Sequence, residues 1–183
     1  MELILASQSP RRRELLGLLE RPFTVRVADI DETMDPGLSA YDAVAQVSLR
    51  KALAVRREPE DIVIAADTIV VRDGRILGKP KDEAEAESML RLLSGRAHQV
   101  MTGMTVLKGE RQTVTVEVTD VHFRELSDRE ILDYVRSGDP MDKAGAYGIQ
   151  SGAALFCHRI EGDYYNVVGL PVCRLAEILQ TYL

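Results

Sequence analysis

The stretch DIVIAADTIVV, residues 61–71, decides the fold class of this chain. Its side chains are almost continuously apolar and strand-forming, which is typical of a strand buried on both faces of a sheet. One acid, Asp67, interrupts the run. Burying an ionised carboxylate is costly unless it is paired, hydrogen-bonded or bound to a metal. Asp67 is therefore either a functional group or an acid that caps a neighbouring loop.

Strand-like and helix-like segments alternate on both sides of this stretch. Strands are expected over residues 2–6, 23–29, 98–107 and 112–126. Helices are expected to start at Ser9–Pro10 and Pro171, and to cover residues 39–58, 81–95 and 128–138. Ser127 and Glu130 have the spacing of a capping box for the last of these segments. The interleaving predicts an α/β protein with a mixed sheet flanked by helices.

Composition limits the class of protein further. The 183 residues suit a single domain over 1–183, with room for two lobes. A net charge of −6 argues against a nucleic-acid partner, so any anion must meet a local basic cluster. No apolar run is long enough to span a bilayer and no signal peptide is evident, which favours a cytoplasmic protein without a membrane partner. Cys157 and Cys173 are expected to be reduced core thiols.

The start of the first helix carries an unusual concentration of positive charge. Arg11, Arg12 and Arg13 follow the Ser9–Pro10 helix start, where the helix dipole favours acids. These arginines are badly placed for the helix but well placed for a polyphosphate, which a helix N-terminus also attracts. The alternative is that they point sideways into solvent, and for Arg13 we expect that outcome.

Other charged residues add to this candidate anion site. Lys51 lies on the second predicted helix, and Lys79 lies between a glycine and a proline that restrict its backbone. Lone lysines are surface residues by default, but with the arginines these two would suit phosphate. A second carboxylate near Asp67 would make a site for a hard divalent cation. We choose Glu32, although spacing alone does not distinguish it from the neighbouring acids Asp29, Asp31 and Asp35.

A glycine-containing loop over residues 138–152 is the last candidate segment. It lacks the spacing of a phosphate-binding P-loop. Its Gln150 carries an amide that both donates and accepts, which suits reading the edge of a base. The three histidines, His98, His122 and His158, show no metal-type grouping and are expected to be structural.

The ordered motifs resemble the Maf family of nucleoside triphosphate pyrophosphatases nearly from end to end. They are LILASQSPRRRELL, DIDET, AADTIVV, GKPKD, SGRAHQVMTGMTV, GDPMDKAGAYGIQ and EGDYYNVVGLP. The resemblance implies an inosine-triphosphatase-like fold with an elongated mixed sheet and a cleft between two lobes. It also implies hydrolysis of a nucleoside triphosphate to the monophosphate and pyrophosphate with a divalent metal, Mg²⁺ or Mn²⁺.

The resemblance also implies roles for individual residues. Asp67 falls on the family's catalytic acid and would be the proton acceptor. Glu32 would hold the metal together with Asp67. The phosphate-binding positions fall on Ser7, Arg12, Lys51 and Lys79.

Three positions distinguish subgroups within the family. The subgroup acting on dTTP and UTP carries an arginine, a threonine and a glutamine where this chain has Arg11, Thr68 and Gln150. A sister subgroup acting on 7-methyl-GTP carries a tryptophan and two acids there. The resemblance therefore implies a pyrimidine nucleoside triphosphate as substrate, standard or modified. Ser151 departs from the usual GIQG motif and would alter the pocket if that glycine needs a positive φ.

Two other functions remain open at this point. The family's association with arrest of septum formation suggests a protein-binding module with a vestigial anion site. The same chemistry could also act on another base. The complete set of costly polar residues argues against the binding module, and Arg11, Thr68 and Gln150 argue against another base. A homodimer is plausible by resemblance alone.

Overall fold

The computed structural model describes residues 1–27 and 29–183. The strands are β1 (Leu3–Leu5), β2 (Thr24–Val25), β3 (Ile62–Arg72), β4 (Arg75–Leu77), β5 (Ala97–Lys108), β6 (Arg111–Phe123) and β7 (Cys157–Glu161). The helices are α1 (Pro10–Gly17), α2 (Ala40–Val55), α3 (Glu83–Leu93), α4 (Asp128–Arg136), α5 (Tyr164–Val168) and α6 (Val172–Gln180). Three short 3₁₀ turns, η1 (Asp139–Asp142), η2 (Ala144–Ala146) and η3 (Gly152–Leu155), lie in the glycine-containing loop.

The described strands form one mixed sheet. Its order is β2-β1-β3-β5-β6-β7, with β4 paired antiparallel to β3. Helices flank the sheet, so the predicted α/β class with a mixed sheet is confirmed. Within the described ranges, none of the helices is long and apolar enough to cross a bilayer.

The chain divides into two compact units. Unit 1 contains residues 1–68, 102–117 and 169–183, and unit 2 contains residues 69–101 and 118–168. The core of unit 1 includes the fully buried Ile4, Ala52 and Val63. The core of unit 2 includes Leu90 and Phe123. The strands β3, β5 and β6 contribute residues to both units.

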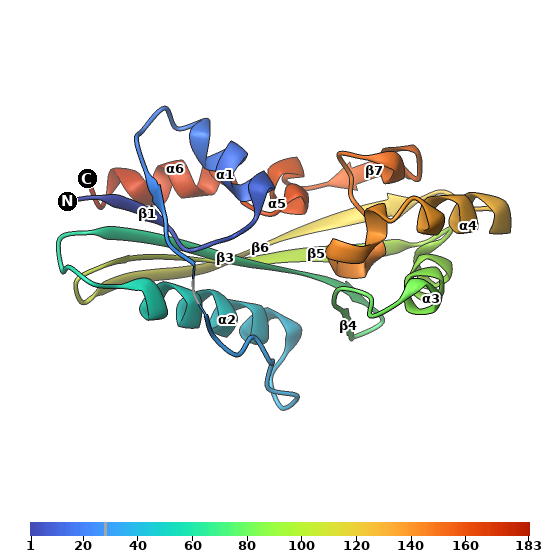
Figure 1. The fold of residues 1–183 in the computed structure, drawn as a ribbon, viewed down its shortest axis with the longest axis horizontal. Coiled ribbons are helices and arrows are strands. Elements are labelled where there is room, and N and C mark those ends of the chain that lie inside the picture. The colour runs from blue at the N-terminus through green and yellow to red at the C-terminus, as the bar shows by residue number, and fades with distance from the viewer. Residues whose placement is uncertain (28) are drawn as a thin grey trace. The chain divides into compact units, whose positions relative to one another are not determined.

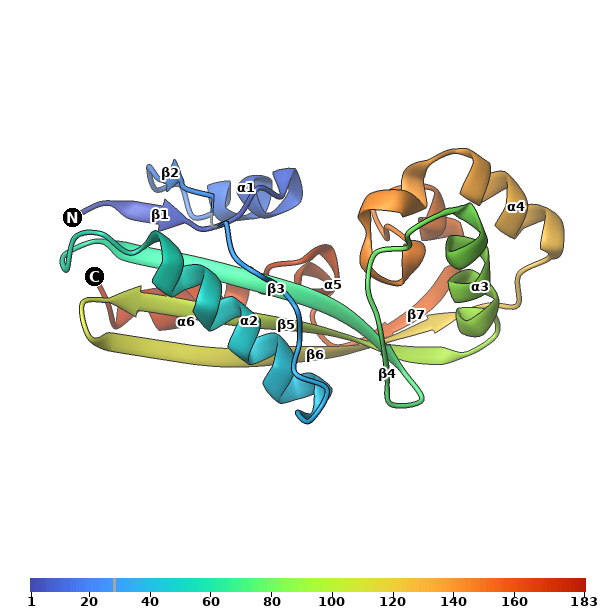
Figure 2. The ribbon, with the colours of Figure 1, turned by 60° about the horizontal axis from the view of Figure 1, so that its bottom comes forward.

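Unit 1 contains a reversal of strand order. The strand β1 pairs in parallel with β2 on one side and with β3 on the other. The helix α1 lies on one face of the sheet and α2 on the opposite face, as Figures 1 and 2 show. In open parallel sheets, ligands bind outside the carboxyl ends of the strands where the order reverses. A ligand is therefore expected outside the carboxyl ends of β1 and β3.

The second strand is shorter than the sequence indicates. A strand was expected over residues 23–29, but β2 covers only Thr24–Val25. The partner strand β1 has three residues, and Thr24 and Val25 pair with its Ile4 and Leu5. A short partner limits the ladder, which ends with the Arg26 N–H donating to the Leu5 carbonyl at 3.0 Å. Residue 28, within the expected strand, lies outside the described residues.

The helix α2 packs very closely on β5. A Cβ atom added at Gly103 would lie 2.3 Å from the carbonyl oxygen of Val44, so only glycine fits this approach. Nearby, the hydroxyls of Ser48 and Thr105 are hydrogen-bonded at 2.8 Å in the buried interface. These contacts fix α2 and thereby fix the position of Lys51, two turns after Val44.

Unit 2 confirms the predicted capping box. The Ser127 side chain accepts from the backbone N–H of Glu130, and the Glu130 carboxylate accepts from the N–H of Ser127. The expectation for the cysteines is wrong in part. Both are free, but Cys157 is half-buried and Cys173, which belongs to unit 1, is exposed. Cys173 lies on the outward face of α6, whose inward face is formed by Leu175, Ile178 and Leu179.

His98 is a structural histidine, as its sequence context indicates. It is 3% exposed, and its Nε2 shares a hydrogen bond of 2.7 Å with the Tyr147 hydroxyl. Desolvation by burial lowers the pKa of His98 from 6.5 to about 3, and the charge of Arg72 adds to this effect. Between these two pH values the imidazole is therefore neutral in the folded protein but protonated in the unfolded chain.

This burial predicts a loss of stability in acid. Between pH 6.5 and about 3 the unfolded state binds one more proton at His98, so the free energy of unfolding falls as the pH falls through this window. Replacing His98 with Phe is expected to reduce the slope of that dependence by up to about 1.4 kcal/mol per pH unit. Urea unfolding at several pH values measures the slope, and an unchanged slope would contradict the assignment.

Candidate active site

The first part of the site is the turn from β1 into α1. Ser9 caps α1, its hydroxyl accepting from the backbone N–H of Arg12 at 3.4 Å, and Pro10 occupies the first turn as predicted. The hydroxyl of Ser7 accepts from the N–H of Ser9 at 3.2 Å. The turn thus directs Ser7 and the N-terminus of α1 toward the carboxyl ends of β1 and β3.

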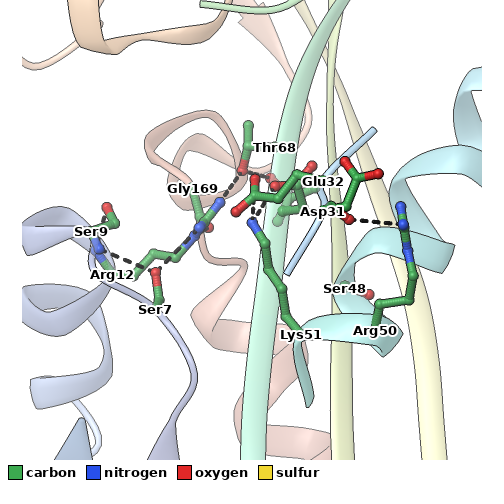
Figure 3. Close-up of polar contacts among 12 residues, drawn as sticks. Ser7, Ser9, Arg12, Asp31, Glu32, Ser48, Arg50, Lys51, Thr68 and Gly169 are labelled. Carbon is green, nitrogen blue, oxygen red and sulfur yellow. Dashed lines mark hydrogen bonds and ion pairs between the residues drawn. The ribbon is translucent and has the colours of Figure 1, made fainter. Parts of the chain in front are cut away.

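The side chain of Arg12 is held inward by three partners. Its Nε donates to the Gly169 carbonyl at 2.8 Å, and its terminal nitrogens donate to the hydroxyls of Ser7 at 3.3 Å and Thr68 at 3.0 Å (Figure 3). Gly169 has a φ of +129°, which favours glycine at this point. Desolvation lowers the pKa of Arg12, and the nearby Asp67 carboxylate opposes that shift. Arg12 is therefore a preorganised cation.

The other arginines of this helix differ in exposure. Arg11 is half-buried, and Arg13 is exposed to solvent, as expected for it. The positive charge at the start of α1 is thus divided between an inward cation, Arg12, and an outward one, Arg13.

The second part of the site is a buried lysine between two carboxylates. The Nζ of Lys51 on α2 lies 2.7 Å from the Asp67 carboxylate on β3 and 2.9 Å from that of Glu32 (Figure 3). The side chains of Lys51 and Asp67 are 9% and 12% exposed, whereas that of Glu32 is 56% exposed. The acid that interrupts the apolar strand is thus a paired carboxylate rather than a loop cap.

The two parts meet at neighbouring residues of β3. Asp67 contacts α2, and Thr68 contacts Arg12 on α1, so successive side chains point to opposite faces as strand alternation predicts. The main-chain ladder with β1 reaches only Ile64, where the Ala6 N–H donates to its carbonyl at 2.7 Å. Asp67 and Thr68 lie beyond the end of β1, which leaves that edge of β3 open to a ligand.

Two further predicted residues belong to unit 2. Lys79 and Gln150 are both exposed. The glycine-containing loop is tied to the segment before Lys79, because the Gly145 N–H donates to the Gly78 carbonyl at 3.0 Å. Unit 2 therefore carries both side chains on connected loops.

Comparison with known proteins identifies the family. A family model described as Maf-like protein matches residues 2–182. The chain belongs to the Maf family. It is 53% identical over 182 residues to a dTTP/UTP pyrophosphatase of Symbiobacterium thermophilum, covering 99% of this chain and 94% of the relative. It is 53% identical over 174 residues to a dTTP/UTP pyrophosphatase of Geobacillus sp. (strain WCH70), covering 94% of each.

Solved structures with the same fold are much more distant in sequence. A HAM1 protein from Coxiella burnetii superposes with a TM-score of 0.55 at 17% identity, covering 99% of each chain. The Staphylococcus aureus Ham1 protein superposes with a TM-score of 0.53 at 15% identity, covering 100% of each chain. At these identities the similarity shows that the Maf chain shares this fold, and nothing more.

The carboxylates of the Maf site fit a divalent cation. Asp67 and Glu32 converge on one cation, the ammonium of Lys51, and their oxygens are the hard donors that Mg²⁺ prefers. Over residues 1–27 and 29–183, no group of three or more His, Cys, Asp or Glu residues could hold a metal. Two carboxylates suit an ion that completes its coordination with water and substrate phosphates.

The structure adds three residues that the sequence does not distinguish. Thr102 is fully buried, and its hydroxyl shares a hydrogen bond of 2.9 Å with Thr68. Gly169 holds Arg12 from 157 residues away in the chain. Arg50 donates to the carbonyls that flank Glu32. The local sequence around Gly169 and Arg50 does not indicate that these residues hold parts of the site.

Ser151, the departure from the usual Maf motif, is well accommodated. Its φ is −120°, so this position needs no glycine. Its hydroxyl lies 2.5 Å from the Asp139 carboxylate and 3.0 Å from the Gly148 carbonyl. A hydroxyl has one proton, so the shorter contact to the carboxylate is the donated hydrogen bond. The Tyr134 hydroxyl and Lys143 also donate to Asp139, and the cluster holds the loop next to Gln150.

Ser151→Ala tests whether this cluster orders the loop. Loss of a hydrogen bond to a carboxylate is expected to raise KM for dTTP about fivefold with little change in kcat. Steady-state pyrophosphate release measures both constants. Ser94→Ala is the matched control, since Ser94 also holds a loop of unit 2 through its hydroxyl, at the Leu126 N–H. Equal KM values for the two variants would contradict the assignment.

Proposed function

We propose that this Maf protein hydrolyses dTTP and UTP to the nucleoside monophosphate and pyrophosphate. The observation that carries the proposal is the pair of neighbouring residues on β3, Asp67 held by the buried Lys51 and Thr68 held by Arg12. Asp67 and Arg12 lie on opposite faces of β3 outside the end of β1, but their charges interact, which suits water activation next to a polyphosphate. The names of the relatives supply the substrate class.

The reaction assigns a task to each charged residue. Asp67 accepts the proton of the attacking water as the new P–O bond forms and the anhydride bond between the α- and β-phosphates breaks. General-base catalysis of this kind contributes about 10²- to 10⁴-fold. Ser7, Arg12, Lys51 and Lys79 bind the phosphates and offset the negative charge that develops on the leaving pyrophosphate.

A divalent cation held by Glu32 and Asp67 supplies Lewis-acid neutralisation of the phosphate charge when it is bound. Mg²⁺ and Mn²⁺ both accept carboxylate, phosphate and water oxygens. The residues proposed to select the base are Arg11, Thr68 and Gln150. Thr68 connects selection of the base to phosphate binding, because its hydroxyl also accepts a hydrogen bond of 3.0 Å from the phosphate-binding Arg12.

A protein-binding module is the less favoured alternative. Burying the Asp67 carboxylate and the Lys51 ammonium costs desolvation free energy. A module that binds a protein through its surface would gain nothing from this burial. We therefore propose that residues 1–183 form one catalytic domain.

Pyrophosphate release from a panel of nucleotides tests the proposal. The panel contains dTTP, UTP, CTP, ATP, GTP and 7-methyl-GTP, each with Mg²⁺, with Mn²⁺ and with a chelator. Metal-dependent turnover of dTTP and UTP is expected. Turnover confined to purine nucleotides would contradict the base assignment, and no turnover of any nucleotide would contradict the function.

A further inference from the structure

Arg50 lies next to Lys51 on α2 and grips the backbone around Glu32. One terminal nitrogen of Arg50 donates to the Asp31 carbonyl at 2.9 Å and the other to the Thr33 carbonyl at 2.8 Å. Figure 3 shows Arg50 reaching the segment from α2, beside Lys51 and Glu32. The segment 31–33 is thus bound twice by consecutive residues of one helix: by Arg50 through its backbone and by Lys51 through the Glu32 carboxylate.

The segment has little else of its own to fix it. Asp31, Glu32 and Thr33 are exposed and belong to no helix or strand. The local contact within it is a turn in which the Asp31 carboxylate accepts from the Thr33 N–H at 2.9 Å. Ordering the backbone of an exposed residue costs about 1–2 kcal/mol. Contacts from outside the segment are therefore needed to hold Glu32 in one position.

A guanidinium is suited to this task. Its planar fork carries donors on two separate nitrogens, so it can satisfy two carbonyls at once, whereas a lysine ammonium acts as a point charge. Arg50 is half-buried, so its stem is already ordered against the protein. Its grip fixes the 31–32 peptide unit, directly before Glu32, and the 33–34 peptide unit, one residue beyond it. The Asp31 carboxylate holds the Thr33 N–H between them, so the direction of the Glu32 side chain is restricted from both sides.

We propose that Arg50 is a positioning residue that holds the Glu32 carboxylate at the site. It thereby sets the affinity for the divalent cation of the site when a nucleotide is bound there. The proposal rests on the proposed function, because it assigns Glu32 to that cation. Among the described residues, the hydrogen bonds of Arg50 go to these two backbone carbonyls, so Arg50 acts on the cation through Glu32.

Direct Mn²⁺ binding tests the proposal without turnover. Mn²⁺ titrations followed by electron paramagnetic resonance are made with the full chain and the non-hydrolysable α,β-imido analogue of dTTP. Arg50→Met keeps the apolar stem and removes the fork, and it is expected to weaken Mn²⁺ binding about tenfold. Arg50→Lys is expected to weaken it less. Thermal unfolding is recorded for each variant, and if Arg50→Met does not fold, Arg50→Lys carries the test.

Arg56→Met is the matched control. Arg56 stands at the end of the same helix and donates to the Gly109 carbonyl at 3.0 Å, so it makes the same type of contact elsewhere in unit 1. Mn²⁺ binding by this variant is expected to equal that of the unaltered protein.

Glu32→Gln shows whether Arg50 acts through Glu32. In that background, Arg50→Met is expected to produce no further weakening. Unchanged Mn²⁺ affinity in Arg50→Met and Arg50→Lys, or the same tenfold loss with and without Glu32, would overturn the proposal. Failure of the unaltered protein to hydrolyse dTTP would instead contradict the proposed function, while the Mn²⁺ titrations would still report on Arg50.

Discussion

Asp67→Asn is expected to lower the rate of pyrophosphate release from dTTP about a thousandfold, within the range that a general base contributes. The amide occupies the same space and still accepts from the Lys51 ammonium, which the carboxylate meets at 2.7 Å, but it cannot take a proton from water. Binding of the α,β-imido analogue of dTTP is expected to change far less than kcat. Single-turnover pyrophosphate release and calorimetric binding measure the two effects separately.

Asp61→Asn is the control for this variant. Asp61 is also a buried carboxylate of unit 1, 7% exposed, and it precedes the same strand. Its partners, the Glu2 N–H and Arg26, lie away from the proposed site. It is expected to affect stability and not kcat. If Asp67→Asn retains more than about a tenth of the normal kcat, the carboxylate is not the proton acceptor.

The sequence predicts the parts of the site that depend on local rules. An acid inside a run of buried apolar residues must have a partner, and Asp67 has one in Lys51. The Ser9–Pro10 helix start follows from capping preferences and places Arg12 near the end of β1. The alternation of a strand predicts that Asp67 and Thr68 face opposite sides of the sheet, and their partners come from α2 and α1.

The rest depends on packing that no local pattern contains. Lys51 reaches Asp67 because α2 sits directly on Gly103, an approach determined by tertiary structure. The Gly169 carbonyl, which accepts the hydrogen bond from the Arg12 Nε, is 157 residues away from Arg12 in the chain. The alternating residues 23–29 predict a longer strand than β2, because the sequence does not reveal that the partner strand has only three residues.

The position of Lys51 has a consequence for the metal. Its ammonium touches both carboxylates proposed to hold the cation, at 2.7 Å and 2.9 Å. An ammonium and a divalent cation repel each other at such short range, so they compete for Asp67 and Glu32. A triphosphate offers Lys51 alternative anionic partners and removes this competition. Metal and nucleotide are therefore expected to bind cooperatively to the unaltered protein.

Lys51→Met is accordingly expected to lower turnover and stability but to strengthen Mn²⁺ binding in the absence of nucleotide. It removes a phosphate ligand, so turnover of dTTP falls by about a hundredfold or more. It also leaves the buried Asp67 carboxylate without its partner, and breaking a buried ion pair costs about 3–5 kcal/mol of unfolding free energy in the presence of a chelator. Saturating Mn²⁺ supplies the missing positive charge, so in this variant Mn²⁺ without nucleotide is expected to restore about 2.7 kcal/mol, the effect of a ligand at a hundred times its Kd.

Urea unfolding with Mn²⁺ and with a chelator, both without nucleotide, measures this difference. The unaltered protein is expected to gain little from Mn²⁺ because Lys51 already occupies the carboxylates. The control is Lys51→Met combined with Asp67→Asn, in which the uncompensated charge is gone, so the Mn²⁺ effect should disappear. In the unaltered protein, Lys51 must be displaced from both carboxylates before they can bind a metal. If Mn²⁺ stabilises the unaltered protein and Lys51→Met equally, the cation therefore binds elsewhere.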